Sequence, residues 1–207
     1  MVFGHRDGAV SRCGLLVPRR CGRYRVAGLV ADGENQVVVG VELSDGVVDL
    51  VPFGLEHVEA NLAGEDSDLV RWLSGAPSTR EGMTDYARRC QRCWIDGTDP
   101  LAFAIMVAGV GVQAGYVDVR FRLAGLGEGR VNVSYGLYPQ WRGRGLMTHA
   151  VDLVCGFARR RGAAQAVIRC AVENVASAAV AVRAGFRFEG RFPEPDGQLF
   201  EHYVRDL

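Results

Sequence analysis

The sequence predicts an α/β domain built on a mixed sheet, and three observations support this fold class. Strand-like segments follow one another at 101–107, 112–123 and 131–138, with glycine-rich turns between them, as in an antiparallel meander. Helical and strand-like segments then alternate from Leu146 onward. The length of 207 residues fits one domain, or one domain with an appendage.

Strands and short helices are expected ahead of this meander. β-Branched residues fill 37–43 and 47–53, and the turn-forming Ser44-Asp45-Gly46 between them predicts a hairpin. Asp66 or Ser67 is expected to begin the second of two short helices. Apolar residues at helical spacing mark these helices: Leu55, Val58 and Leu62, then Leu69, Trp72 and Leu73.

A longer helix should carry the one close pair of cysteines. Ser78-Thr79-Arg80-Glu81 has the pattern of a capping box. One face of the helix after it would hold Met83, Tyr86, Cys90, Cys93 and Trp94. Cys90 and Cys93 have the spacing of a metal or redox site, but no second close pair completes a zinc site. We therefore expect buried, apolar thiols. The other cysteines are scattered, which favours a reducing, cytoplasmic setting.

The C-terminal part should contain two helices and three strands. After Gly145 the apolar spacing becomes helical, and Gly162 ends that helix. Arg159-Arg160-Arg161 falls in its last turn, where the helix dipole favours cations, so we expect a solvated helix end and not a nucleic-acid site. The segments after it are a strand, a short helix and two strands, at 166–172, 176–184, 186–192 and 199–207.

The charge balance limits the classes of partner. The chain has 24 arginines, no lysine and 24 acidic residues, so its formal net charge is zero. A broad nucleic-acid-binding surface usually needs a basic excess, so no nucleic-acid partner is expected. The apolar stretch at 101–112 is shorter than the about 20 residues that cross a bilayer, so no membrane partner is expected.

The N-terminal segment differs from the rest in charge. The first 25 residues carry six arginines against one acid, Asp7. A transit peptide would be basic in this way, whereas a secretory signal would need an apolar stretch that the segment lacks. We favour a poorly ordered basic extension over 1–36, followed by one folded domain over 37–207.

The junction after the strand at 131–138 carries the strongest chemical signal. Gln140-x-x-Gly143-x-Gly145 connects this strand to an amphipathic helix. Such a turn leaves backbone N–H groups free at the positive end of a helix, which is a site for an anion such as a pyrophosphate. Arg142 and Arg144 should add positive charge beside it. A Walker loop is excluded because the chain has no lysine, and a dinucleotide-binding fingerprint would need a further glycine in a parallel unit.

This loop lies within Val133-Ser-Tyr-Gly-Leu-Tyr-Pro-Gln-Trp-Arg-Gly-Arg-Gly-Leu-Met-Thr-His-Ala150, and a second motif is Val172-Glu-Asn-Val-Ala-Ser-Ala-Ala-Val-Ala-Val-Arg-Ala-Gly-Phe-Arg-Phe-Glu-Gly190. In these segments, and in Val47-Val-Asp-Leu-Val-Pro-Phe53, the chain resembles the GNAT superfamily of acetyl-CoA-dependent N-acetyltransferases. It is most similar to the branch that acetylates the N-termini of ribosomal proteins. The resemblance covers roughly residues 45–207.

The resemblance implies a GNAT fold, a mixed and mostly antiparallel sheet flanked by helices. Two neighbouring parallel strands, here 131–138 and 166–172, splay apart in this fold and hold the pantetheine arm of the cofactor. The implied activity is transfer of an acetyl group from acetyl-CoA to a primary amine, by direct attack in a ternary complex. No metal is implied. A homodimer is expected because relatives often pair.

The resemblance also implies which residues contact acetyl-CoA. Among them, a backbone N–H near Leu137 would stabilise the oxyanion, and Ser177 would donate a proton to the leaving thiol. From spacing alone, Asn174 and Ser177 would be an ordinary N-cap and first-turn serine. The implied set is Leu137, Tyr138, Gln140, Arg142, Gly143, Arg144, Gly145, Leu146, Met147, Asn174 and Ser177.

The base and the acceptor are left open. Tyr135 and Tyr138 would either line the acceptor site or pack, and a water chain could also take the proton of the amine. The acceptor could be a protein N-terminus, a small metabolite or an antibiotic amine such as an aminoglycoside, and acyl groups longer than acetyl stay open. A non-catalytic acyl-CoA-binding regulatory module is the alternative. The side chains within reach as a base are Asp118, Glu128, His149 and Glu173.

Overall fold

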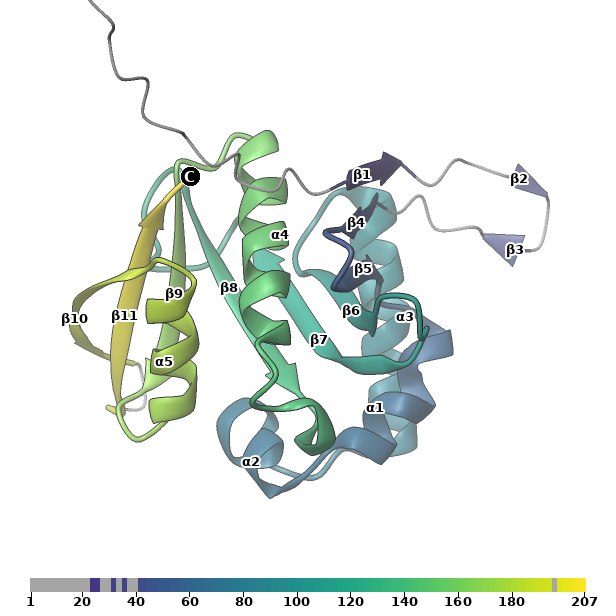
Figure 1. Ribbon diagram of the computed structural model, residues 1–207, viewed down its shortest axis with the longest axis horizontal. Coiled ribbons are helices and arrows are strands. Elements are labelled where there is room, and N and C mark those ends of the chain that lie inside the picture. The colour runs from purple at the N-terminus through teal and green to yellow at the C-terminus, as the bar shows by residue number, and fades with distance from the viewer. Residues whose placement is uncertain (1–22, 27–30, 33–34, 37–40, 195–196) are drawn as a thin grey trace, which may run out of the picture.

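A computed structural model describes residues 23–26, 31–32, 35–36, 41–194 and 197–207 (Figure 1). Its nine-stranded sheet has the order β1-β4-β5-β6-β7-β8-β9-β11-β10, in which β8 and β9 are parallel and the other neighbouring pairs are antiparallel. A separate two-stranded ladder joins β2 (Ala31–Asp32) and β3 (Asn35–Gln36). The strands of the main sheet are β1 (Arg23–Val26), β4 (Val41–Ser44), β5 (Val48–Pro52), β6 (Leu101–Val107), β7 (Gln113–Arg120), β8 (Arg130–Leu137), β9 (Gln165–Ala171), β10 (Arg187–Pro193) and β11 (Leu199–Asp206).

Helices cover both faces of the sheet, as the sequence predicts for an α/β domain. In Figure 1, α4 and α5 lie in front of the strands, and α2 lies below the lower end of β8. The helices are α1 (Val58–Gly64) after a 3-10 turn at Leu55–His57, α2 (Ser67–Leu69) continuing into a π-helical turn at Val70–Ser74, α3 (Arg80–Asp96), a 3-10 turn at Pro139–Trp141, α4 (Leu146–Arg160) and α5 (Val175–Arg183).

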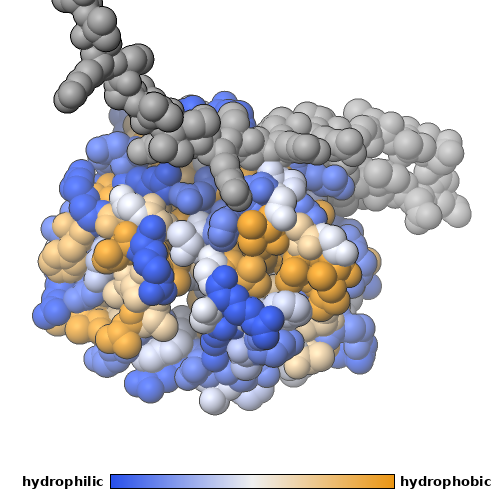
Figure 2. All heavy atoms as spheres, viewed as in Figure 1, coloured by the Kyte–Doolittle hydropathy of each residue, from blue (hydrophilic) through white to orange (hydrophobic). Residues whose placement is uncertain are grey.

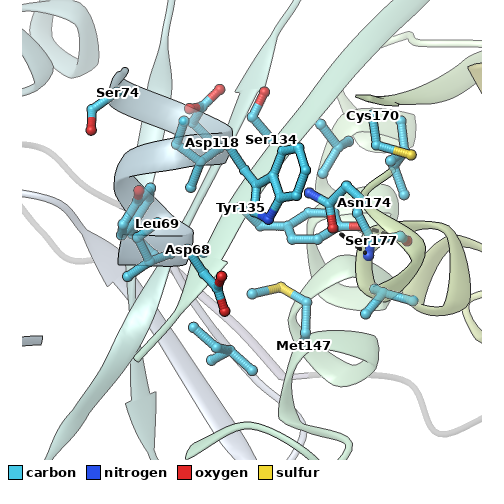
Figure 3. A pocket seen from close by; sticks show the side chains of 18 of the residues that line it. Asp68, Leu69, Ser74, Asp118, Ser134, Tyr135, Met147, Cys170, Asn174 and Ser177 are labelled. Carbon is cyan, nitrogen blue, oxygen red and sulfur yellow. Dashed lines mark hydrogen bonds between the residues drawn. The ribbon is translucent and has the colours of Figure 1, made fainter. Parts of the chain in front are cut away.

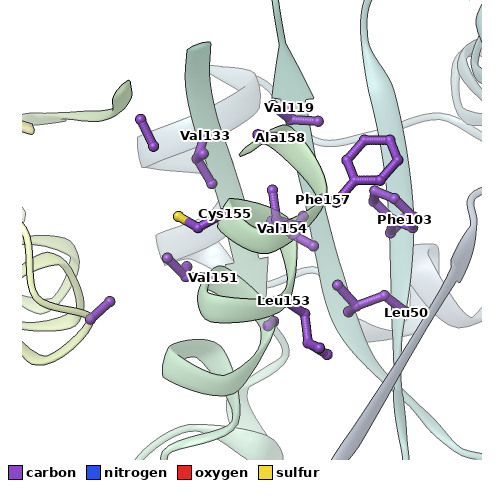
Figure 4. Close-up of a cluster of buried hydrophobic side chains, with 14 of the residues drawn as sticks. Leu50, Phe103, Val119, Val133, Val151, Leu153, Val154, Cys155, Phe157 and Ala158 are labelled. Carbon is purple, nitrogen blue, oxygen red and sulfur yellow. The ribbon is translucent and has the colours of Figure 1, made fainter. Parts of the chain in front are cut away.

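The alternation of side chains along β6 builds a core on each face. Phe103 points toward α4 and meets the ring of Phe157 edge to face at 5.4 Å (Figure 4). Ala102 and Ala104 point the opposite way, and small side chains there let α3 pack closely through Cys90. Burial on both faces fixes the register of β6, because a slip of one residue would exchange the two sets.

The helix that carries the close cysteine pair begins one residue later than predicted. The N-cap is Thr79, whose Oγ1 accepts the N–H of Gly82 at 3.1 Å, so the four-residue capping box does not form. Ser78 bonds to Glu65 instead. Cys90 and Cys93 are buried free thiols, as predicted, and burial raises the pKa of Cys90 to about 12. Such a thiol stays neutral and packs as an apolar side chain.

The structure describes only part of the N-terminal region for which predictions were made. β1 falls inside the predicted extension over 1–36, where its backbone pairs with β4. The strand predicted over 37–43 is described from Val41. Residues 1–22 and 37–40 lie outside the described residues, and with them most of the basic segment. None of the helices in the described ranges is long and apolar enough to cross a membrane.

The sheet splits at the parallel pair, as the fold prediction requires. β8 and β9 pair from Arg130↔Gln165 to Asn132↔Val167 and no further. Beyond that point β8 stays paired with β7 to Leu137, whereas β9 stays paired with β11 to Ala171. A wedge therefore opens between two halves of one sheet, next to the N-terminus of α4.

Candidate active site

The wedge opens into a cavity of about 1330 Å³ that passes from one face of the sheet to the other. Its walls come from β8 and β9, the segment α2 with its π-helical turn, α3, and the first turns of α4 and α5. Figure 2 shows one face of the molecule. Hydrophobic side chains gather toward the left and the right of this face, and hydrophilic ones lie between them. The volume is large enough for a nucleotide-sized ligand together with a second molecule.

The loop between β8 and α4 is shaped to bind an anion. Gly143 and Gly145 have φ values of 74° and 78°, in the left-handed region that glycine adopts without a steric penalty. The backbone N–H groups of residues 143–147 donate to none of the described residues, and the first helical bond of α4 is from Thr148 to Gly145. Free N–H groups at a helix N-terminus favour a phosphate, so the loop fits the pyrophosphate of acetyl-CoA.

The side chain of Arg142 differs from the expectation that it faces this anion. Its Nη1 and Nη2 both bond Asp66 at 2.8 Å, its Nη1 reaches Asp68 at 3.2 Å, and its Nε donates to the carbonyl of Leu137 at 3.0 Å. The hydrogen bond from Arg142 lowers the pKa of Asp66. The guanidinium therefore ties the loop to the N-terminus of α2, and two carboxylates compensate its charge. The N–H of Arg142 bonds the carbonyl of Pro139 and is not among the free groups.

Arg142 still lines the cavity, but four other residues of the expected set do not. Tyr138 is buried between β7 and α1, where its hydroxyl donates to Asn61 and accepts from the side-chain amide of Gln113. Leu146 is buried in the core against the sheet, Gln140 is exposed, and Arg144 is exposed with its guanidinium over the ring of Trp141. The seven that do line the cavity are Leu137, Arg142, Gly143, Gly145, Met147, Asn174 and Ser177.

The backbone of Leu137 points into the wedge. Tyr138 donates its N–H across to Ala114 on the β7 side. Because successive N–H groups of a strand point to opposite edges, the N–H of Leu137 points toward β9. No described residue accepts from it. This N–H is therefore free to bond a carbonyl oxygen held between the strands.

Asn174 and Ser177 stand on the far wall of the wedge (Figure 3). Asn174 Oδ1 caps α5 by accepting the N–H of Ser177 at 3.1 Å, which leaves its side-chain NH₂ for a ligand. The Ser177 hydroxyl lies 3.0 Å from the hydroxyl of Tyr135, which reaches across the wedge from β8. Burial raises the pKa of Tyr135, so its hydroxyl stays protonated and can exchange a hydrogen bond with Ser177. Sequence reasoning missed this pair because the two residues are 42 positions apart.

Of the four candidate bases, one lines the cavity and three lie outside it. His149 bonds Asp45 of the β4–β5 turn through Nδ1 at 2.5 Å and lies outside the cavity. Glu128 and Glu173 are exposed and also lie outside it. Asp118 lines the cavity from β7. Among the described residues, no three His, Cys, Asp or Glu side chains are arranged to hold a metal ion.

Comparisons with known proteins agree with this geometry. None of the curated proteins matches the chain. RimL, a ribosomal L7/L12 α-N-protein acetyltransferase in complex with coenzyme A, superposes with a TM-score of 0.67 at 22% identity over 78% of this chain and 94% of that one. The acetyltransferase from Salmonella typhimurium that modifies the N-terminal serine of protein L7/L12 gives 0.65 at 22%, over 78% and 95%. The microcin C7 self-immunity acetyltransferase MccE, in complex with acetyl-CoA and AMP, gives 0.65 at 18%, over 78% and 93%.

These solved structures establish the likeness in fold, and the sequence itself places the chain in a family. The acetyltransferase (GNAT) domain family matches residues 48–187, about two thirds of the chain, and the match includes the loop, the splayed strands and α5. With its free N–H groups at α4 and its wedge between β8 and β9, this chain belongs to the GNAT acetyltransferase family.

Proposed function

We propose that the protein acetylates the α-amino group of polypeptide N-termini, by direct attack of the amine on acetyl-CoA in a ternary complex. One observation carries this proposal. The free N–H groups of residues 143–147 lie at one end of the wedge, and Ser177 lines the same cavity from α5. Phosphates at the loop and a thioester beside Ser177 would occupy one continuous cavity. The acceptor then enters from the face lined by α2 and α3.

The residues of the wedge have different roles in the reaction. The N–H groups of the loop hold the phosphates, and the NH₂ of Asn174 holds the pantetheine arm. The N–H of Leu137 stabilises negative charge on the carbonyl oxygen. Ser177 gives its proton to the leaving sulfur and regains one through Tyr135 or water, because the two hydroxyls are within hydrogen-bond distance.

The preference for a polypeptide N-terminus is supported by two facts. The related fold from Salmonella typhimurium modifies an N-terminal serine. The acceptor half of the cavity, which is the part on the side of α2 and α3, is lined by polar groups from several elements, which suits an extended chain end. A small-molecule amine is the second candidate, because MccE, whose structure holds AMP as well as acetyl-CoA, shares the fold equally well.

Thiol release from acetyl-CoA tests the proposal. The acceptors are peptides with free N-terminal serine, alanine or methionine, the same peptides with blocked N-termini, and a set of aminoglycosides and small amines. We expect release with the free peptides and only background release with the blocked ones. Release with aminoglycosides or small amines alone would favour the second candidate. Binding of acetyl-CoA without release by any amine would contradict an enzymatic role and favour an acyl-CoA-binding module.

A further inference from the structure

The acceptor half of the cavity contains a buried carboxyl group that the steps above do not use. Asp118, on β7, keeps 6% of its side chain exposed and lines the cavity. Its Oδ1 accepts from Nε of Arg120 at 3.3 Å, near the outer limit of a hydrogen bond, and no described residue donates to its Oδ2. An ionised carboxylate in such a place is incompletely compensated, and it will attract a proton or a cation.

Burial sets Asp118 apart from the other carboxylates of the cavity. Both oxygens of Glu65 are held by the N–H and hydroxyl of Ser78. Asp68 is 63% exposed and pairs with the Arg142 that holds the loop. Glu194 pairs with Arg169 at 3.0 Å and is 23% exposed. Among the described residues, Asp118 is the only Asp or Glu that is buried.

The register of the sheet brings Asp118 to the level of the wedge. Asp118 lies opposite Ser134 of β8, on a neighbouring strand about 4.8 Å away. Ser134 precedes Tyr135, whose hydroxyl contacts Ser177. Figure 3 shows Asp118 and Ser134 side by side on one wall, with Asn174 and Ser177 on the other. A molecule that reaches into the gap between β8 and β9 lies between these walls.

The charged and titratable groups around Asp118 come from three elements. Burial raises its pKa to about 6, and Arg120 of its own strand partly offsets this. The other group that acts on it is Asp99, in the turn before β6, which adds to the rise. Its neighbours on α3 are Tyr86 and Cys90, and Tyr116 is on β7; the charge of Asp118 raises the pKa of each of them. Asp118 is thus ionised at neutral pH and is a stronger base than a surface carboxylate.

We propose that Asp118 accepts the proton that the acceptor amine must lose, directly or through one bridging water. The inference rests on the proposed function. In the reaction the nitrogen bonds the acetyl carbon and the carbon–sulfur bond breaks. The amine reacts in its neutral form, after its ammonium form has given one proton to solvent. The nitrogen loses its second proton to Asp118 as the amide forms, and Asp118 passes that proton to solvent. The sulfur takes its proton from Ser177, which regains one from solvent through Tyr135 or water.

The test is the pH dependence of kcat/KM for the full-length enzyme and its Asp118→Asn variant, with a peptide acceptor. An α-amino group ionises near pH 8, so the wild-type profile should rise with slope two below about pH 6 and slope one above it. Asp118→Asn should lower the rate at pH 7 by about 100-fold or more and keep slope one throughout. Asp118→Glu should restore the steeper limb. The matched control is Asp85→Asn, at an exposed carboxylate of α3.

Two further measurements separate this role from a structural one. Acetyl-CoA affinity should be the same in Asp118→Asn and the wild type, and the urea midpoint at pH 8 should be equal or higher because a buried charge is removed. An Asp118→Asn enzyme that keeps its rate and its slope-two limb would overturn the assignment. A wild-type enzyme that releases thiol with no amine would instead overturn the proposed function, before Asp118 comes into question.

Discussion

Replacing Gly143 by alanine should separate the fit of the loop to a phosphate from its contribution to the fold. Apart from its two chain neighbours, a β-carbon at Gly143 would meet no atom of the described residues within 4 Å, so the described fold has room for the added methyl group. The backbone there has φ 74°, and this conformation costs a non-glycine residue about 1–2 kcal/mol. The free energy of unfolding should fall by that amount. Because Gly143 lines the cavity, the methyl group also enters the space of the anion, and the affinity for acetyl-CoA should fall more than tenfold.

Gly46 provides the matched control. It has φ 84° in the β4–β5 turn, and a β-carbon there likewise has only its chain neighbours within 4 Å in the part of the chain that the structure describes. Gly46→Ala should therefore cause a similar loss of stability and leave acetyl-CoA affinity unchanged. Urea unfolding gives the first quantity and titration calorimetry gives the second. If the two variants bound acetyl-CoA equally well, the loop after β8 would not be the phosphate site.

Three other substitutions test single contacts. Ser177→Ala should lower kcat by about 100-fold with acetyl-CoA affinity retained, in steady-state assays; full turnover would remove Ser177 as proton donor. Tyr138→Phe should cost about 1–3 kcal/mol in urea unfolding, because two buried partners lose their hydrogen bonds, and a fall in acetyl-CoA affinity would show that the residue reaches the cavity after all. Asp66→Asn should cost about 1 kcal/mol at pH 7. Since Arg142 lowers the folded pKa of Asp66, this difference should vanish as the pH falls below about 4, and a difference that persists would argue against the ion pair.

Local sequence patterns predicted the fold because the deciding features are local. The turn at Asp45-Gly46, the period-two strands of the meander and the amphipathic spacing of α4 each depend on residues within one segment. The free N–H groups of residues 143–147 also follow from one strand–turn–helix junction. The loop could therefore be located from the sequence alone.

Contacts between distant segments could not be predicted in this way. Arg142 and Asp66 are 76 residues apart, so spacing alone gave no indication that the arginine would turn away from the anion. Tyr138 comes directly after the strand that lines the wedge. Its side chain nevertheless points toward α1, where it contacts Asn61, and not into the cavity. The Asp118–Ser134 pair depends on the register between β7 and β8, which a sequence pattern does not fix.

The same division explains which property of the enzyme each half of the cavity controls. The cofactor half is made largely of backbone N–H groups, whose positions depend on glycine conformations and on where a helix begins. The acceptor half is made largely of side chains. Besides those of α2 and α3, they include Asp118, Asn132, Arg169 and Glu194, from β7, β8, β9 and the β10–β11 hairpin. In that half, Asn132 bonds both Ser134 and Arg169, so one change there moves several polar groups at once. Substitutions of Asn132, Arg169 or Glu194 should therefore alter which amine is used and leave acetyl-CoA affinity unchanged, because the hydrogen bonds of these side chains go to Ser134 and to one another and not to the loop.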